Sequence, residues 1–162
     1  MDLKNHHHPL GAVDFWSWLF PVTYLIHIAE EYWGGEGYPA YLLRVRGVHL
    51  TAGRFWLAQT IGTLMMALGI YLARRFNFAP MMAVIMAATV LGNALTHALT
   101  SISNGGYGPG LISALFIWMP LGIWCLILFR NDISKQRYWL SLAIGAGVNI
   151  AVYVIAMRGA RL

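Results

Sequence analysis

The sequence predicts an all-α, polytopic membrane protein, a helical bundle with about five transmembrane helices in one domain covering residues 1–162. Of the 162 residues, 59% are hydrophobic and only 10% are charged. A soluble domain carries roughly 25% charged residues. Five apolar stretches are long enough for a membrane-spanning helix, which takes about 20 residues. Neither an internal repeat nor a second domain is visible in the sequence.

The charges and the cysteine usage exclude several classes of function. The net charge of +5 does not indicate nucleic-acid binding, because the basic residues lie at helix ends, where they set topology and contact lipid headgroups. Cys125 is the single cysteine, so an intrachain disulfide and a thiolate metal cluster are excluded. We therefore expect a membrane lipid or another hydrophobic substrate as the partner, and no nucleic acid.

The first apolar stretch covers about residues 15–33 and contains Pro21, which a transmembrane helix tolerates when its neighbours satisfy the freed carbonyl. The segment 34–50 is rich in glycine and ends with arginines, so it does not span the membrane. It predicts a short interfacial or re-entrant element.

Four further spans follow, separated by short polar segments. Pro80 opens one of them, as proline often does at a first helical position. In the last span, Ser141, Gly145 and Gly147 are small residues that allow helices to approach closely. The predicted spans are 51–73, 80–102, 111–129 and 138–157.

Threading five spans puts the turns at 74–79 and 130–137 on the same face as the N-terminus. The segment 34–50 and the loop 103–110 lie on the other face. Basic residues are nearly balanced between the faces, and the tight turns favour the first face as cytoplasmic.

The strongest functional signal is the motif His27-x-x-Glu30-Glu31 near the end of the first span. An acidic residue in the middle of a spanning helix costs roughly 2.5–3.5 kcal/mol, and such residues usually mark a function. Positions i, i+3 and i+4 share one helix face, so the three side chains can converge.

A second polar group lies on the third span, where Asn93, Thr96, His97 and Thr100 form one stripe. The first and third spans run in the same direction. Glu30, Glu31 and His97 therefore fall at a similar depth, roughly 10 Å past the helix midpoints. The glycine-rich loop 104–110 is expected to close over this region.

Imidazole and carboxylate together suit zinc or iron. We predict a divalent metal held by His27, Glu31 and His97, with zinc favoured over iron. The i, i+4 spacing is similar to the inverted zincin motif H-x-x-E-H, in which the intervening glutamate is the base, so Glu30 is predicted as the general base. The alternative is an internal cluster in which Arg54 and His97 neutralise the glutamates without a metal.

Three motifs occur in order along the chain: His27-x-x-Glu30-Glu31, Asn93-x-x-x-His97 and Tyr107-x-Pro109-Gly110. By these motifs the chain resembles a family of small prokaryotic membrane proteins named for its HXXEE motif. The resemblance groups Asn93 and Tyr107 with the acidic motif and implies a prokaryotic plasma membrane, but it supplies no reaction. A looser similarity links the chain to CAAX-type intramembrane proteases, although the arginine that follows their glutamate pair is missing.

These observations predict a metal-dependent membrane hydrolase that acts on a lipid or other hydrophobic substrate. Asn93 and Tyr107 are then predicted to orient the substrate or stabilise developing charge. Two alternatives use the same residues. One is an iron-dependent oxidoreductase, for which the supply of carboxylates is small. The other is a proton or cation relay in a small transporter.

Overall fold

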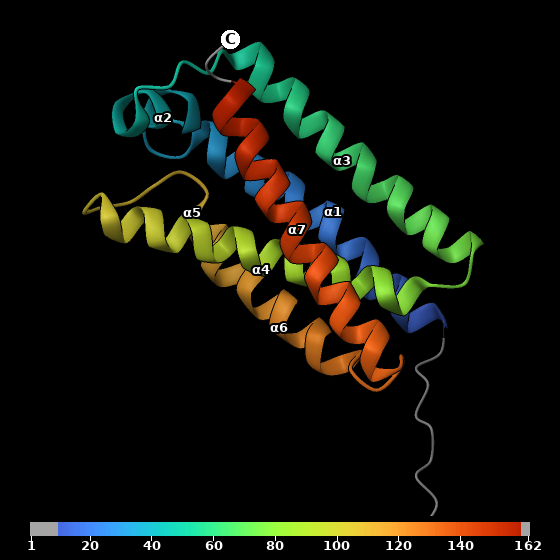
Figure 1. Ribbon diagram of the computed structural model, residues 1–162. Helices are drawn as coiled ribbons and strands as arrows, with labels where there is room; N and C mark the ends of the chain where they lie inside the picture. The colour runs from blue at the N-terminus through green and yellow to red at the C-terminus, as the bar shows by residue number, and fades with distance from the viewer. Residues whose placement is uncertain (1–9, 160–162) are drawn as a thin grey trace, which may run out of the picture.

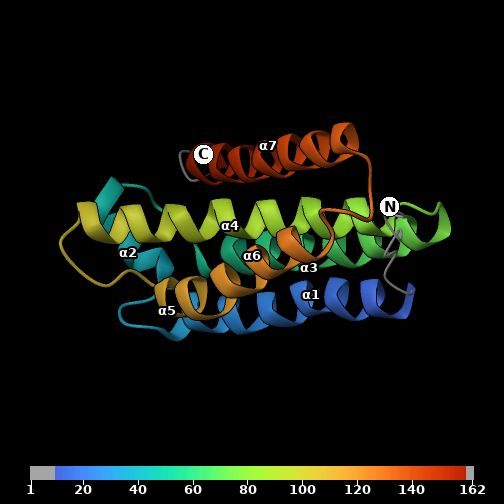
Figure 2. The same cartoon turned by 90° about the horizontal axis from the view of Figure 1, so that it is seen from below.

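The structure, a computed structural model, describes residues 10–159, which form helices and connecting turns and contain no strand. Figures 1 and 2 show the helices running up and down one elongated bundle, with the start of α1 and the end of α7 at opposite ends of it. The elements are α1 (Leu10–Trp33), α2 (Tyr38–Arg46), α3 (Ala52–Arg75), α4 (Ala79–Ser103), α5 (Leu111–Ser113), the π-helix η1 (Ala114–Trp118), α6 (Met119–Leu128) and α7 (Lys135–Gly159).

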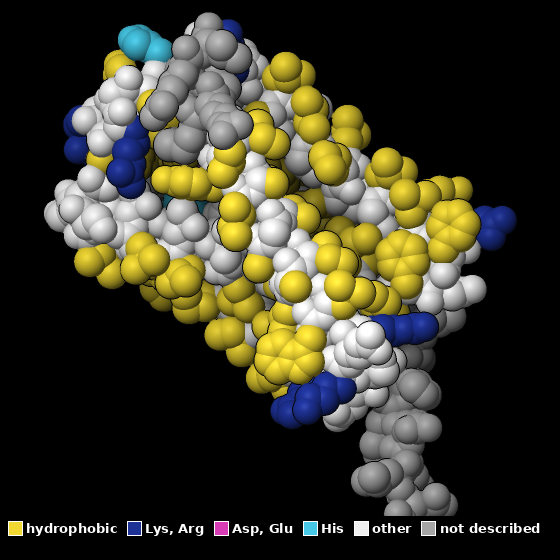
Figure 3. All heavy atoms as spheres, in the orientation of Figure 1, with side chains coloured by type: hydrophobic (Ala, Val, Ile, Leu, Met, Phe, Trp, Pro, Cys, Tyr) yellow, Lys and Arg dark blue, Asp and Glu magenta, His cyan; other side chains and the backbone are white. Residues whose placement is uncertain are grey.

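The predicted fold class is confirmed. Four helical segments combine the length and apolar composition needed to cross a membrane: Ala52–Arg75, Ala79–Ser103, Leu111–Leu128 and Lys135–Ala156. Helix α1 is 24 residues long and packs against α3 and α4, but its acidic residues and histidine lower its hydropathy. The chain is thus an all-helical membrane protein with about five spans. Figure 3 shows hydrophobic side chains along the bundle and Lys and Arg side chains near its ends.

Helix α4 is the centre of the bundle and packs against α1, α3, α6 and α7. Its inward face carries small and medium apolar side chains, which are buried and let the neighbouring helices approach closely. The fully buried members of this face are Ala83, Val84, Ala87, Val90 and Ala94.

The close approach predicted for the last span is confirmed at Gly145 and not at Gly147. A Cβ on Gly145 would lie 2.6 Å from the Ala88 Cβ on α4, whereas a Cβ on Gly147 would meet nothing within 4 Å. Thr89 also donates a hydrogen bond to the Gly145 carbonyl, at 3.1 Å. Gly145 therefore faces α4, and Gly147 faces outward.

The first helix begins at Leu10 rather than at the predicted residue 15. Asp14, within the added turn, forms an ion pair of 3.2 Å with Arg74 near the end of α3. Because Asp14 is paired with Arg74 at the end of the bundle, its carboxylate is tolerated in the first turns of an otherwise apolar helix. The segment predicted as a short non-spanning element contains the nine-residue helix α2.

The span predicted over 111–129 is a helix with a π-helical segment, η1, inside it. The N–H of Met119 bonds to the carbonyl of Ala114, five residues back. Pro120 has no N–H to donate and its ring crowds the preceding turn, which accounts for the wider turn at this point. Such π-segments occur frequently at functional sites.

Candidate metal centre

The three predicted ligands lie together at one end of the bundle. His27 and Glu31 belong to the last turns of α1, and His97 belongs to α4. Figures 1 and 2 show that α2, the loop before α5, and α5 itself gather at this same end. His27 and Glu31 are buried and His97 is partly buried, so the cluster is enclosed by the surrounding elements.

The potential ligand atoms of His27, Glu31 and His97 all lie within 4.8 Å of one another. Glu31 Oε1 is 3.7 Å from His27 Nε2 and 3.5 Å from His97 Nε2. Donors around a tetrahedral zinc, at about 2.0–2.1 Å from the ion, are roughly 3.4 Å apart. A charge-assisted hydrogen bond would instead be about 2.7–2.9 Å. His27, Glu31 and His97 thus come together, whereas Glu30, which was expected to converge with His27 and Glu31, bonds elsewhere. The spacing within the cluster suits an intervening cation better than direct hydrogen bonds.

His27 contacts the Ser113 hydroxyl through one ring nitrogen and leaves the other without a hydrogen bond among the described residues. Ser113 Oγ donates to the Gly110 carbonyl at 3.3 Å and lies 2.8 Å from His27 Nδ1. Donation of the single hydroxyl proton to Gly110 makes His27 Nδ1–H the donor to Ser113 and leaves a lone pair on Nε2, the tautomer in which this ring could bind a cation. This Nε2 is buried and makes no hydrogen bond among the described residues. A lone pair on this atom would be available to a cation shared with Glu31 Oε1.

The ring of His27 also stacks on Trp118, with centroids 3.9 Å apart and planes 30° apart, and Trp118 belongs to η1. The ring of His97 meets that of His27 edge to face, with centroids 4.9 Å apart. These contacts restrict the orientation of the two imidazole rings.

Glu31 is oriented from α3. Gln59 Nε2 donates to Glu31 Oε2 at 2.8 Å, and the Tyr24 hydroxyl in turn donates to Gln59 Oε1. Because Oε2 is held in this way, Oε1 is the oxygen that faces both histidines. Partners of this kind, behind a ligand, usually tune metal affinity.

Gly110 closes the site from the loop side. Its φ of 88° is left-handed, which favours glycine. A Cβ there would lie 2.8 Å from Cε1 of both His27 and His97, and 2.9 Å from Glu31 Cγ. The loop backbone thus lies directly against all three side chains, as predicted for the glycine-rich loop.

Glu30 faces the loop after α4 and the start of α5. Its Oε1 accepts hydrogen bonds from the Tyr107 hydroxyl (2.9 Å) and the Ile112 N–H (2.8 Å). Its Oε2 accepts one from the Ser113 N–H, at 2.6 Å. Glu30 therefore anchors the start of α5, and Ser113 connects it to His27.

The other two predicted site residues differ in their positions. Tyr107 contacts Glu30, and partial burial together with this hydrogen bond raises its pKa to about 12, so the phenol keeps its proton at neutral pH. Asn93 lies one helical turn before His97, and its Oδ1 is buried without a hydrogen bond among the described residues. Within residues 10–159, Asn93 makes no hydrogen bond to the three clustered side chains.

Helix α2 covers the site from the outside. The ring centroid of Tyr38 lies 6.5 Å from that of His97, and burial together with the charge of Glu31 raises the pKa of Tyr38. Asn104 Nδ2 donates a hydrogen bond to the Tyr41 hydroxyl oxygen at 3.3 Å, which connects α2 with the loop.

Sequence reasoning missed four residues that contact the cluster: Ser113, Gln59, Trp118 and Tyr38. Gln59 could have been found, since it is an isolated amide in an apolar span. Ser113 and Trp118 carry no such signal, because serine and tryptophan are common in membrane helices.

The family comparison covers the whole of this site. A family model described as a protein of unknown function with HXXEE motif matches residues 18–125, which include all three motifs and end within α6. The search found no match to a curated protein and none to a solved structure.

Proposed function

Because the chain belongs to the family of proteins of unknown function with an HXXEE motif, we propose its function from the site: a zinc-dependent membrane hydrolase acting on a lipid or other hydrophobic substrate. The observation that carries this proposal is the buried group of His27, Glu31 and His97, with its unpaired imidazole nitrogen. We further propose that it works in a prokaryotic plasma membrane.

Two imidazole nitrogens and one carboxylate oxygen form a ligand set that occurs in catalytic zinc sites. A zinc ion bound there would supply Lewis acidity and lower the pKa of a water molecule. His27 Nε2, Glu31 Oε1 and His97 Nε2 would hold it. Ser113 keeps His27 in the tautomer that has this lone pair, and Gln59 directs the Glu31 carboxylate.

Glu30 is the proposed general base. Its Oε1 accepts two hydrogen bonds, but Oε2 accepts one, so Oε2 keeps an acceptor position for a proton. Tyr107, protonated at neutral pH, is a hydrogen-bond donor beside it. The unpaired Oδ1 of Asn93 is proposed to orient the substrate.

A hydrophobic substrate is favoured by a groove between α1 and α3. It has a volume of about 130 Å³, is lined by Leu25, Trp33 and Trp56 among others, and also includes Gln59. Gln59 donates to Glu31, so one side chain connects a lipid-facing groove with the ligand cluster. A hydrocarbon chain in this groove would bring its attached group toward the site from within the membrane.

The two alternatives draw less support. A di-iron centre usually takes carboxylates from four helices, and near this cluster the described carboxylates are Glu30 and Glu31, both from α1. A relay would need polar side chains that continue across the membrane. The polar contacts of His27, Glu30 and Glu31 all lie at one end of the bundle.

The test is hydrolysis of a fluorogenic, ester-linked phospholipid in liposomes containing the zinc-loaded protein. We expect hydrolysis by the native chain and a loss of about 10²–10⁴-fold in Glu30→Gln, since general-base catalysis contributes this much. Gly147→Ala, which changes an outward-facing position of α7, serves as the control and should retain full activity. Failure of the zinc-loaded protein to cleave ester- and amide-linked lipids would remove the hydrolase proposal.

A further inference from the structure

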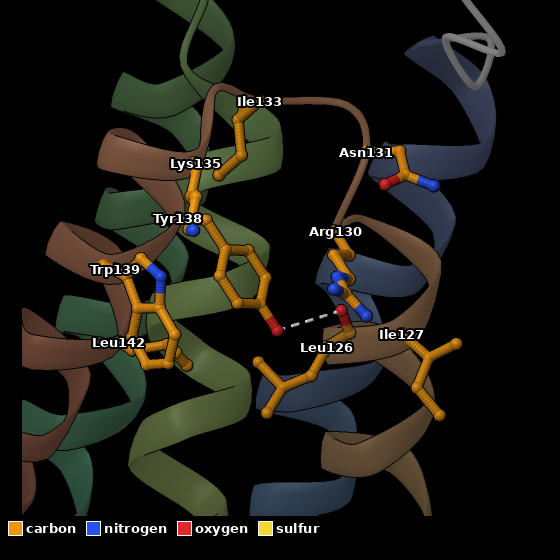
Figure 4. Close-up of a pocket in the computed structure, with 9 residues that line it drawn as sticks. All are labelled: Leu126, Ile127, Arg130, Asn131, Ile133, Lys135, Tyr138, Trp139 and Leu142. Carbon is orange, nitrogen blue, oxygen red and sulfur yellow. Dashed lines mark hydrogen bonds between the residues drawn. The ribbon is translucent and has the colours of Figure 1, made fainter. Parts of the chain in front are cut away.

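A second site lies at the opposite end of the bundle, in the groove where the turn after α6 leads into α7. The groove has a volume of about 800 Å³. Figure 4 shows its lining residues coming from α6, from the turn and from α7, with Tyr138 in the middle. These residues lie beyond residue 125, where the family match ends. Because it lies at the opposite end of the bundle, the groove is separate from the proposed metal centre.

One part of the groove is apolar and fixed in shape. Leu126 and Ile127 come from the end of α6, and Trp139 and Leu142 from the start of α7. The Tyr138 hydroxyl donates to the Leu126 carbonyl at 3.2 Å, as the dashed line in Figure 4 marks, and so connects the two helices. Ile127 and Trp139 are exposed, at helix ends where hydrocarbon meets water.

The other part is cationic. Arg130 and Lys135 line the groove, both are exposed, and neither takes part in an ion pair among the described residues. The segment 130–137 contains Arg130, Lys135 and Arg137 against Asp132 alone, three positive charges and one negative charge, which leaves a net +2. Asp132 is not part of the groove lining.

We propose that this groove binds an anionic phospholipid. Arg130 and Lys135 would contact the phosphate, and an acyl chain would lie on Leu126, Ile127 and Leu142. Only an amphipathic anion matches both halves of the groove at once, with charge at the water side and hydrocarbon at the membrane side. Trp139 fits this boundary, because tryptophan is enriched at the level of the lipid headgroups.

Native mass spectrometry of the detergent-purified full chain can test the proposal. The lipids are phosphatidylglycerol and phosphatidylcholine with identical acyl chains, and inorganic phosphate represents the headgroup alone. We expect phosphatidylglycerol to be retained in preference to phosphatidylcholine, and phosphate alone not to bind. Arg130→Gln and Lys135→Gln should each weaken phosphatidylglycerol binding about fivefold, the effect of one basic residue near an anionic lipid surface.

Arg75→Gln is the matched control, because Arg75 is an exposed cation at the same end of the bundle, at the end of α3 and outside the groove. It should leave retention unchanged. Equal weakening by Arg75→Gln and Arg130→Gln would show a general charge effect and overturn the site. If inorganic phosphate binds as tightly as phosphatidylglycerol, the groove does not select a lipid. Equal retention of phosphatidylglycerol and phosphatidylcholine would likewise contradict the proposal.

Discussion

One side-chain atom of His27 and one of Glu31 contact a neighbouring polar side chain, while a second atom of each faces the cluster. Ser113 contacts His27 Nδ1 and Gln59 contacts Glu31 Oε2, so Nε2 and Oε1 face the same space. His27 Nε2 is buried and makes no hydrogen bond among the described residues, and a buried polar atom without a partner costs about 1–3 kcal/mol. A bound cation would remove that cost.

Gly110→Ala should disturb this arrangement through the new methyl group. The Cβ would lie 2.8 Å from Cε1 of His27 and of His97, so we expect lower metal occupancy as well as lower stability. Gly105→Ala is a close control, because Gly105 also has a positive φ, 68°, but has open space around its Cβ position. It should lose stability and keep the metal. Measuring metal content and thermal unfolding of both variants separates the effect of backbone strain at a positive φ from the effect of a methyl group placed against His27 and His97.

Glu30→Gln should destabilise the segment 107–113 without emptying the metal site. An amide NH₂ in place of Oε2 would face the Ser113 N–H, so a charge-assisted hydrogen bond worth about 1.5–3 kcal/mol is lost. Tyr107→Phe removes one neutral donor and should cost about 0.5–1.5 kcal/mol. Unfolding free energies in detergent measure the difference. An equal cost for the two variants would mean that Glu30 does not anchor α5.

At the level of single residues, the sequence predicts the cluster well and its support poorly. The spacing of His27 and Glu31 puts both on one helix face, and equal depth on parallel helices brings in His97. The supporting contacts come from Gln59 on α3 and Ser113 on α5, whose rotation about their helix axes is set by packing. Hydropathy does not reveal that rotation.

The helices differ in how far their sequence determined them. The spans on α3 and α4 were predicted within two residues at each end, because Arg74, Arg75 and Pro80 mark their boundaries. The π-helix η1, which lies just before Pro120, was not predicted. A π-segment depends on how Trp118 packs against His27 as well as on the proline, and no local pattern encodes that contact.

The contact between α4 and α7 gives a prediction for an element. Gly145→Ala would bring a methyl group to 2.6 Å from the Ala88 Cβ, and such overpacking typically costs about 1–3 kcal/mol. Gly147→Ala, two residues later, enters open space and should leave stability unchanged within about 0.5 kcal/mol. Thermal unfolding in one detergent compares them. Similar effects of the two substitutions would mean that α7 is rotated from its position here.

On the scale of the whole molecule, the two proposed sites lie at opposite ends of the bundle. The ligand cluster lies at the end where α1 and α4 finish, and the cationic groove lies at the end where α6 finishes and α7 begins. The predicted threading, with the first and third spans running in the same direction, accounts for this separation. If α1 crosses the membrane, its first residues lie on the same side as the turn before α7; if it does not, they lie on the opposite side.

Single cysteines test this threading, with the buried native Cys125 as the background. If α1 spans the membrane, cysteines at Gly11 and Asn131 should react with an impermeant reagent from one side, and a cysteine at Asn104 from the other. All three positions are exposed. Labelling of Gly11 from the same side as Asn104 would show that α1 does not cross, and would reduce the number of spans to four.

The central claim is that His27, Glu31 and His97 bind a metal ion, and elemental analysis after purification without chelator tests it most directly. We predict about one zinc ion per chain, with the three side chains as its protein ligands. His27→Ala, Glu31→Gln and His97→Ala should each lower the content strongly, while Glu30→Gln keeps it. A native protein that holds no metal and gains no thermal stability from added zinc would contradict the claim. Unchanged occupancy across the three ligand variants would contradict it equally.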